Sequence, residues 1–164
     1  NTLYAGLGTA IMAPEPGVLL HNHGMGFVVD PDHPNGVAPG KRPLHTIIPG
    51  MATRNGKTTM SFGVMGGEYQ AFGHMQFLTR YFDYGMDVQM AMDTPRFFPD
   101  PFEDFVEVEA PVGADICDAL RARGHDIREA KRPIGGSQAI AIDWETGLLT
   151  AGSDPRKDGC AMGY

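Results

Sequence analysis

Two adjacent glycines, Gly66 and Gly67, stand where an apolar run over 60–65 meets a stretch with helical spacing that begins at Tyr69. Because glycine has no side chain, the backbone N–H groups of such a strand-to-helix turn stay accessible, and they can hold negative charge. Taken alone, a glycine pair is more often structural, since turns of this kind also need its backbone freedom. The pair is therefore a candidate anion site whose chemistry depends on what else the chain supplies.

Other polar residues are weaker candidates. His21 and His23 could present two imidazoles, but no carboxylate or thiol cluster accompanies them at a ligand spacing, so neither a metal site nor a cofactor is expected. Ser137 follows two glycines, yet Ala139 stands where a nucleophile elbow requires glycine, and we expect a turn serine. Three acidic residues are expected to be helix-end or surface groups: Asp83, Asp87 and Asp93.

The composition bounds the class of protein. The chain has 164 residues, of which 42% are hydrophobic and 20% charged, and this is typical of one globular domain, so 1–164 is treated as a single region. The net charge of −7 and the scattered distribution of Lys and Arg argue against a nucleic-acid partner. Glycine, proline or charge interrupts every apolar run well before the roughly 20 residues that cross a bilayer, so no membrane segment is expected.

The cysteines and the first residues bear on cellular context. Cys117 and Cys160 match no metal-binding spacing and are expected to be free thiols, which indicates a reducing compartment and favours a cytoplasmic over a periplasmic location. The sequence starts without an initiator Met and without the basic and apolar segments of a signal peptide. It begins as though within a strand, so a processed or truncated polypeptide is expected.

Glycine, proline and apolar periodicity together predict hairpins that alternate with helices. Residues 13–43 are expected to form a long functional or docked connection around one short strand, Val18–Leu20. Asn55-Gly56 predicts a hairpin between strands over Thr46–Thr53 and Lys57–Met65. Further helices are expected over Glu68–Tyr84, Asp87–Met92 and Ala114–Arg123, and strands over Phe105–Glu109, Asp126–Glu129, Gln138–Asp143 and Leu148–Ser153. This order predicts an α+β fold with a largely antiparallel sheet.

Several segments spread along the whole chain combine into a specific pattern: Pro16–Asn22, Pro39–Pro49, Gly66-Gly67, and Gly152–Lys157 through Gly163-Tyr164. In this order they resemble the small subunit of the γ-glutamyltranspeptidase family, whose members are N-terminal nucleophile hydrolases. The resemblance implies a four-layer αββα sandwich, completed by a larger subunit cut from the same precursor. It also implies a threonine at the new amino terminus whose hydroxyl is the nucleophile and whose α-amino group is the base.

The resemblance implies roles for three residues near the reacting atoms. The backbone N–H groups of Gly66 and Gly67 would form the oxyanion hole for the tetrahedral intermediate of acyl transfer. Thr2 matches a threonine that hydrogen-bonds the nucleophile, so it is expected to support that residue rather than to replace it. The nucleophilic threonine itself is expected upstream of residue 1, so that either the first strand is missing from this sequence or the chain is a truncated product.

Departures from the family pattern bear on the substrate. Tyr4 and Gly26 stand where the γ-glutamyl enzymes have an asparagine and an acidic residue that grip the donor, and His23 replaces a glutamine. His45 and Thr46 replace a pair of serines. Losing the acidic partner removes a charge-assisted bond to an α-ammonium, worth roughly 1.5–3 kcal/mol, whereas imidazoles and a hydroxyl suit a small acid. The pattern is similar to the divergent branch that includes oxamate amidohydrolase, and Tyr4, His23, His45 and Thr46 are expected to contact substrate.

Three functions stay open from the sequence. The first is a subunit of an amide-bond hydrolase or acyltransferase acting on a small carboxylated amide through a threonine acyl-enzyme. The second is a true γ-glutamyltransferase or glutathione hydrolase, and the third is an inactive scaffold fragment. In the first two cases the expected partners are the large subunit, in a heterodimer or a dimer of heterodimers, and a small amide or γ-glutamyl substrate.

Overall fold

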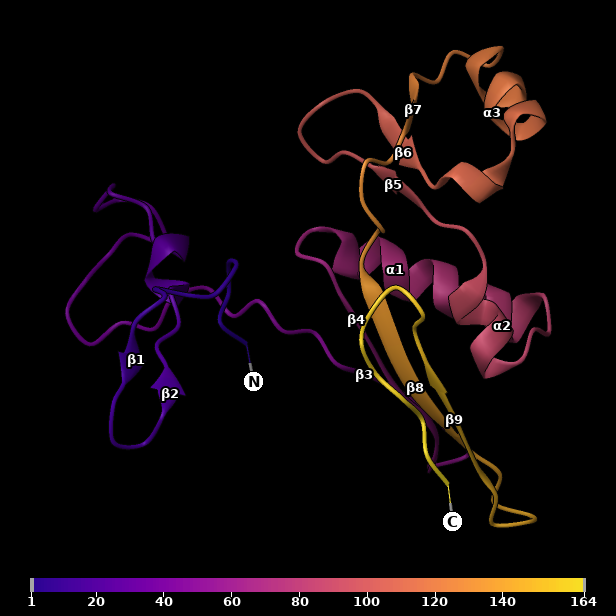
Figure 1. Cartoon of the computed structure of the whole chain (residues 1–164), viewed down its shortest axis with the longest axis horizontal. Helices are drawn as coiled ribbons and strands as arrows, with labels where there is room; N and C mark the ends of the chain where they lie inside the picture. Colours follow the sequence, from indigo (N-terminus) through magenta and orange to yellow (C-terminus); the bar gives the residue numbers. More distant parts are fainter. Residues whose placement is uncertain (1, 164) are drawn as a thin grey trace. The chain divides into compact units, whose positions relative to one another are not determined.

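A computed structural model describes residues 2–163 of the chain (Figure 1). These residues group into two compact units, one that ends at Ile47 and one that begins at Ile48. Each unit has its own elements and is described by itself. The second unit is the larger and contains both sheets of more than two strands.

The first unit contains little regular structure. Strands β1 (Met12–Ala13) and β2 (Val18–Leu19) form a two-stranded antiparallel hairpin, and a 3₁₀ turn, η1, covers His23–Gly26. The expected strand over Val18–Leu20 is confirmed, one residue shorter. The Asn22 side chain holds the loop before the hairpin: its Nδ2 donates to the carbonyls of Ala5 and Gly8, each at 3.1 Å, and its Oδ1 accepts from the Ala5 N–H at 3.0 Å. Few apolar side chains of this unit are buried, so hydrogen bonds of this kind hold its loops.

A four-stranded antiparallel sheet with strand order β3-β4-β8-β9 forms the centre of the second unit. Asn55 and Gly56 take positive φ values of 52° and 76° in the turn between the first two strands, which confirms the hairpin that Asn-Gly predicts. The strand bounds are β3 Gly50–Arg54, β4 Lys57–Met65, β8 Gly136–Ile142 and β9 Leu149–Ser153. Strand β3 begins at Gly50 rather than at Thr46, because Pro49 just before it has no N–H to give to the ladder.

Helices α1 (Tyr69–Leu78) and α2 (Val88–Asp93) lie on one face of this sheet (Figure 1). A π-helical turn, η2, covers Thr79–Asp83 after α1, and the Asp87 carboxylate caps α2 by accepting from the Met90 N–H at 2.7 Å. Strand residues that point to this face are buried against the helices. The main cluster of buried side chains comprises Met60, Phe77, Val88, Ala91, Met92 and Ala139.

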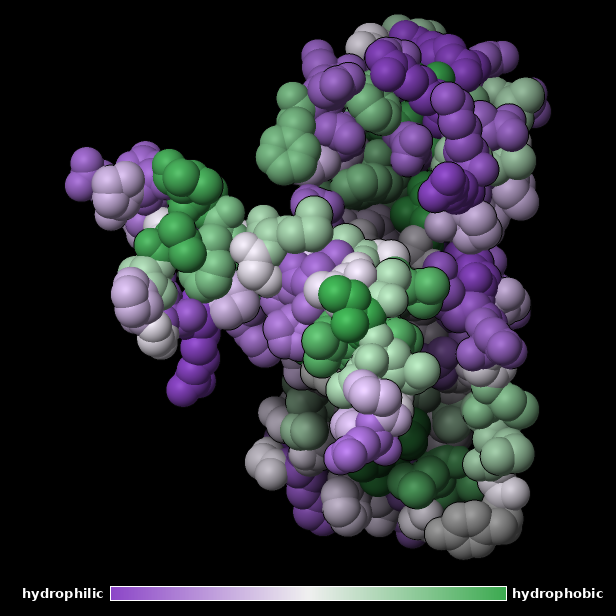
Figure 2. All heavy atoms as spheres, turned by 60° about the vertical axis from the view of Figure 1, so that its left-hand side comes forward, coloured by the Kyte–Doolittle hydropathy of each residue, from purple (hydrophilic) through white to green (hydrophobic). Residues whose placement is uncertain are grey.

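The opposite face of the four-stranded sheet is only partly covered within the second unit, where Lys157 and the residues after it lie against Gly136 and Gln138. Met51, Ser61 and Ile140 are paired neighbours on this face, and Met51 and Ile140 are 65% and 45% exposed. Met65 is also exposed. Figure 2 shows strongly hydrophobic residues at the surface of the molecule. This face therefore combines exposed apolar side chains with polar ones such as Ser61 and Gln138.

A smaller, three-stranded sheet has the order β5-β6-β7. Strand β6 pairs antiparallel with β5 and parallel with β7, and helix α3 joins the two parallel strands after a 3₁₀ turn, η3. The bounds are β5 Phe97–Pro99, β6 Val106–Val108, η3 Ala110–Val112, α3 Ala114–Arg121 and β7 Ile127–Glu129. The predicted α+β class with largely antiparallel sheets is confirmed.

One prediction about a single residue is wrong. Ser137 is not a turn serine: β8 begins at Gly136, so Ser137 is its second residue and is only 2% exposed. Its N–H and Oγ both donate to Asp154 Oδ2, at 2.8 and 2.9 Å, and Arg96 Nη2 donates to its Oγ at 2.8 Å. The strand starts earlier than its apolar pattern indicates because these polar groups are satisfied inside the protein.

Ser137 belongs to a buried network of four charged residues. Arg96 and Asp154 form an ion pair whose side chains are 4% and 0% exposed. Arg156 binds Glu109 through two parallel bonds, Nε to Oε1 at 2.6 Å and Nη2 to Oε2 at 2.5 Å, and reaches Asp154 Oδ1 at 3.3 Å. The network therefore joins the segment after α2, the end of β6, the start of β8 and the segment after β9.

The network keeps its two carboxylates ionised. Burial by itself raises the pKa of Asp154, but bonds from the Arg156 N–H, Arg96 and Ser137 outweigh it, and the pKa lies below its ordinary value. Burial likewise raises the pKa of Glu109, and the hydrogen bonds from Arg156 and from two backbone N–H groups reverse the shift. Both carboxylates are therefore fully charged at neutral pH, and each charge has a partner.

His74 of α1 contacts strand β4 close to the glycine turn. Its Nε2 accepts the N–H of Val64 at 3.2 Å, and its ring meets the Phe62 ring edge-on with centroids 5.1 Å apart. An accepting Nε2 requires the neutral imidazole, and burial lowers the pKa of His74. Protonation of His74 would remove the acceptor of the Val64 N–H, which lies two residues before Gly66.

We expect Asp154→Asn to cost about 3–5 kcal/mol in the free energy of unfolding, because Arg96 would keep a buried charge without its partner. The measurement is urea denaturation of the complete protein. The matched control is Asp126→Asn, which breaks the exposed pair with Arg128 and should leave the midpoint nearly unchanged. Equal midpoints for the two variants would show that the buried network does not stabilise the fold.

We expect the protein to lose stability as pH falls below about 6.5, because unfolded His74 takes up a proton there while the folded state resists it. The contribution is complete above the unfolded pKa and is lost on the way down to the lower, folded pKa. His74→Gln keeps an acceptor and removes the titration, so its stability should vary less between pH 6.5 and 5 (about the range of the imidazole). His125→Gln, at an exposed position, is the control; a wild-type pH curve in His74→Gln would contradict the prediction.

Candidate functional site

The Gly66-Gly67 turn joins the end of β4 directly to the start of α1. Gly66 and Gly67 have φ values of 139° and 61°, in the region that favours glycine. Their carbonyls accept the first hydrogen bonds of the helix, from the N–H of Tyr69 at 3.2 Å and of Gln70 at 3.1 Å. The two glycines thus bend the chain sharply while their carbonyls are used by the helix.

The N–H groups of this turn stay available. Neither Gly66 nor Gly67 donates its N–H to any group among residues 2–163, and no side chain caps the start of α1. Two adjacent N–H donors at the positive end of a helix form a site for a carboxylate, a phosphate or a developing oxyanion. The oxyanion-hole role of these glycines stays a prediction, and it requires N–H groups that are available in this way.

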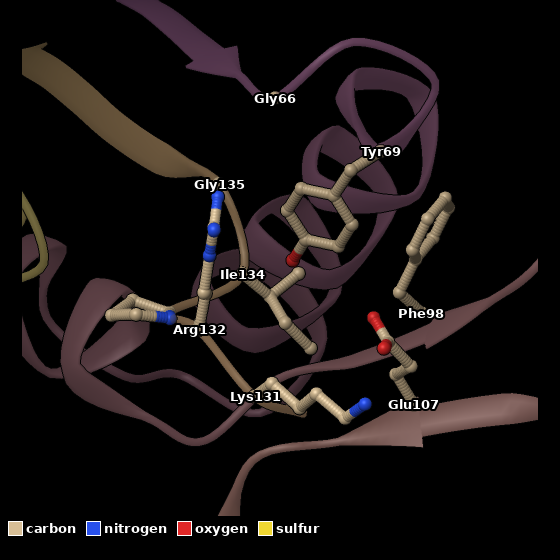
Figure 3. Close-up of a pocket in the computed structure, with 9 residues that line it drawn as sticks. Gly66, Tyr69, Phe98, Glu107, Lys131, Arg132, Ile134 and Gly135 are labelled. Atoms are coloured by element: carbon tan, nitrogen blue, oxygen red, sulfur yellow. The ribbon is translucent and has the colours of Figure 1, made fainter. Parts of the chain in front are cut away.

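A pocket of about 250 Å³ opens beside the turn (Figure 3). Its floor includes the rings of Tyr69 and Phe98, and Glu107, Lys131 and Arg132 bring charge to it. The Tyr69 hydroxyl points into this pocket (Figure 3), is buried and has no hydrogen-bond partner within residues 2–163. Burial raises the pKa of Tyr69 to about 12, so the phenol is neutral and keeps its proton.

The first unit brings three of the predicted site residues together. Thr2 Oγ1 accepts the Tyr4 N–H at 3.1 Å, and the Tyr4 ring lies against the His23 ring with centroids 5.1 Å apart. His21 meets His23 edge-on at 4.9 Å. Tyr4 has a φ of 77°, an unusual value for a residue with a side chain. Thr2, Tyr4 and His23 therefore form one cluster, with a hydroxyl, a phenol and an imidazole at its surface.

The remaining predicted residues lie apart from this cluster in the chain. His45 is exposed and Thr46 is half-buried, both in the extended segment that ends the first unit. Within the described residues no hydrogen bond or ring contact joins His45 to His23. Gly66 and Gly67 belong to the second unit, so the seven predicted site residues are divided between the two units.

No group of three or more His, Cys, Asp or Glu side chains in residues 2–163 is arranged to hold a metal ion, and His21 and His23 gain no third ligand. No helix in the same range is both long and apolar enough to span a membrane.

Sequence reasoning missed the residues that surround the glycine turn. Tyr69 fits the apolar spacing of a helix, and nothing in its position shows that its hydroxyl is buried without a partner. In the sequence, Gly135 is notable only as a neighbour of Ser137, although its φ of 61° shows a second turn that favours glycine. A glycine pair before a predicted strand is the one available signal, and it is not specific.

Comparison with known proteins gives consistent matches along the whole chain. The family model for gamma-glutamyltranspeptidase matches residues 1–164. A glutathione hydrolase-like proenzyme, YwrD, of Bacillus subtilis is 35% identical over 99% of this chain. The oxamate amidohydrolase proenzyme of Klebsiella pneumoniae is 31% identical over 100% of it. The crystal structure of a cephalosporin acylase from Bacillus halodurans superimposes with a TM-score of 0.89 at 39% identity, covering 99% of this chain and 31% of that one.

The matches cover nearly all of this chain but only part of its relatives. The chain spans 32% of the length of each of the two curated relatives, so it corresponds to about a third of their proenzymes. The family model covers the chain from its first residue to its last, and the fold agrees with that of a solved acylase. The segments that resemble the small subunit of this family are thus part of a match that is continuous along the chain. The chain belongs to the γ-glutamyltranspeptidase family.

Proposed function

We propose that this chain is the greater part of the small subunit of an amide-bond hydrolase or acyltransferase. The main observation behind this proposal is the Gly66-Gly67 turn, whose two N–H groups have no partner within residues 2–163. The family relationship supports the same reading, because relatives that match the whole chain are named as hydrolases and acylases.

The proposed reaction is acyl transfer through a threonine ester. The hydroxyl of an amino-terminal threonine attacks the amide carbon and passes its proton to the α-amino group of the same residue. The carbonyl oxygen becomes an anion held by the N–H groups of Gly66 and Gly67, a contribution of about 3–4 kcal/mol per donor. The C–N bond then breaks as the amine takes the proton, and water or an acceptor amine releases the acyl group. Thr2 would support the nucleophile through its hydroxyl.

The preferred substrate in this proposal is a small amide that carries a carboxylate. His23 lies beside Tyr4 in a cluster without an acidic side chain, and His45 and Thr46 supply an imidazole and a hydroxyl. Gly26 offers no charge for an α-ammonium group. The oxamate amidohydrolase proenzyme, whose named substrate is a small carboxylated amide, supports this choice.

A second candidate is γ-glutamyl transfer or glutathione hydrolysis. It is favoured by the glutathione hydrolase-like relative, which is more identical to this chain than is the oxamate amidohydrolase. In that case the contacts to the γ-glutamyl group would come from the large subunit. The third candidate, an inactive scaffold, would need no unpaired N–H groups at Gly66 and Gly67.

The proposal includes a larger subunit as partner. The exposed part of the face opposite the helices presents Met51, Ile140 and Met65, and a second sheet packed there would complete an αββα sandwich. The named relatives are proenzymes about three times as long as this chain, which provides for such a partner in one precursor. The assembly would be a heterodimer or a dimer of heterodimers.

We expect the complete precursor to mature into two chains, the smaller with an amino-terminal threonine, and to release ammonia from oxamate faster than aniline from a γ-glutamyl anilide. Intact mass spectrometry would identify the two chains, and steady-state kinetics would compare turnover of the two substrates. Faster γ-glutamyl turnover would select the second candidate, and no turnover of either substrate by correctly matured protein would select the scaffold.

Gly67→Val should lower kcat at least about 10²-fold with a small loss of stability, because a β-branched residue disfavours a φ of 61° and the N–H groups would lose their aim. The space around Gly67 is open, so no steric clash forces unfolding. Gly147→Val, at a φ of 76° in the β8–β9 hairpin with equally open surroundings, is the strain control. Wild-type turnover in folded Gly67→Val would remove these glycines from the oxyanion hole.

His23→Gln and His45→Ser should each raise KM for a small carboxylated amide and leave γ-glutamyl substrates unaffected or improved, with little change in kcat. An imidazole N–H can donate a hydrogen bond to the substrate carboxylate, and these replacements remove that donor or change its position. The measurement is kcat/KM for both substrate classes. Parallel losses for both classes would mean that the histidines hold the loop and not the substrate.

A further inference from the structure

The turn at Gly66 and the turn at Gly135 lie in contact with each other in the second unit. A Cβ built on Gly66 would lie 3.0 Å from the Cα of Gly135, and 3.3 Å from the Cβ of Tyr69. These distances are shorter than ordinary van der Waals contact, so residue 66 fits here only because it has no side chain. Gly135 and Tyr69 thus form the surface against which the oxyanion turn rests.

Gly135 is confined more tightly than Gly66. Its φ is 61°, and a Cβ there would lie 2.5 Å from Tyr69 Cδ1 and 2.7 Å from the carbonyl oxygen of Met65. Met65 is the last residue of β4 and directly precedes Gly66. A side chain at 135 would therefore push on the peptide whose plane carries the Gly66 N–H, since a carbonyl and the following N–H share one rigid plane.

Bonds to the buried ion network fix Gly135 in place on both sides. Ile134 donates its N–H to Glu109 Oε1 at 3.1 Å and accepts from Arg96 Nη1 at 2.8 Å. On the other side, the N–H of Ser137 donates to Asp154 Oδ2 at 2.8 Å. Gly135 cannot move away from the turn without breaking bonds to buried charges.

We propose that Gly135 and the ring of Tyr69 are positioning residues that set the direction of the Gly66 and Gly67 N–H groups. The inference rests on the proposed function for its catalytic consequence. Gly135 touches no reacting atom; it acts through the Met65–Gly66 peptide. Figure 3 shows Gly135 and Tyr69 on the same side of Gly66, where they bound the pocket.

The contribution of Tyr69 comes from its ring. The ring closes the space between Gly66 and Gly135 and meets Phe98 edge-on with centroids 5.6 Å apart. Its hydroxyl bonds to nothing within residues 2–163, and an unpaired buried hydroxyl costs stability. The Tyr69 ring, and not its hydroxyl, therefore supports the Gly66-Gly67 turn.

The test compares Gly135→Ala with Gly147→Ala in the complete, matured protein. Both glycines have positive φ, but an alanine at 147 meets no atom within 4 Å, so it reports backbone strain alone. We expect Gly135→Ala to lower kcat at least about tenfold with KM changed less than about twofold, and to speed hydrogen exchange of the 64–70 amides. Gly147→Ala should change none of these. Tyr69→Leu should lower kcat, and Tyr69→Phe, which keeps the ring, should restore most of it.

Wild-type kcat in folded Gly135→Ala, or equal exchange of the 64–70 amides in the two alanine variants, would overturn the proposal. So would a kcat loss that disappears after correction for the fraction of active sites. If Gly67→Val also keeps turnover, or the wild-type protein cleaves neither amide, the proposed function fails instead. The exchange measurement then decides the positioning role by itself, because it does not depend on activity.

Discussion

The buried ion pair between Arg96 and Asp154 is the interaction on which the second unit depends. It connects a residue after α2 with a residue after β9, far apart in the chain, and satisfies both charges where water does not reach. Arg156 and Glu109 extend it to the end of β6. Removing one charge leaves the others unpaired, so the network acts as a unit rather than as separate bonds. The start of β8, and with it Gly135, takes its position from these bonds.

The Gly66-Gly67 turn is a second constraint, and it depends on the buried ion network through Gly135. Its N–H groups have no partner among residues 2–163, because the chain bends at Gly66 and Gly67 and the helix uses only their carbonyls. Such a bend needs support from outside, since glycine has the most conformational freedom of any residue. Here packing on Gly135 and Tyr69 supplies the support, and the cost of forming the turn is met by the surrounding fold.

How far the sequence predicts this protein depends on whether a feature is local. The Asn55-Gly56 hairpin, the Asp87 cap and the α+β class follow from short patterns, and the structure confirms them. The start of β8 and the burial of Ser137 were not predictable, because they depend on Asp154, seventeen residues away in the chain. Gly66 and Gly67 are visible as a pair, whereas Gly135 is significant only through a contact between two distant turns. The grouping of Tyr4 with His23 likewise depends on a loop that Asn22 closes.

The exposed apolar residues of the sheet have a consequence for biosynthesis. A sheet with exposed apolar residues on one face and edge strands β3 and β9 is a template for aggregation when it folds without a cover. In the proposed precursor the cover would belong to the same polypeptide, so its docking would be an intramolecular step, at an effective concentration on the order of millimolar for a short connection. Cleavage after folding would then leave two chains whose apolar surfaces had not been exposed together to solvent. Such a precursor would solve a folding problem as well as release a new amino terminus.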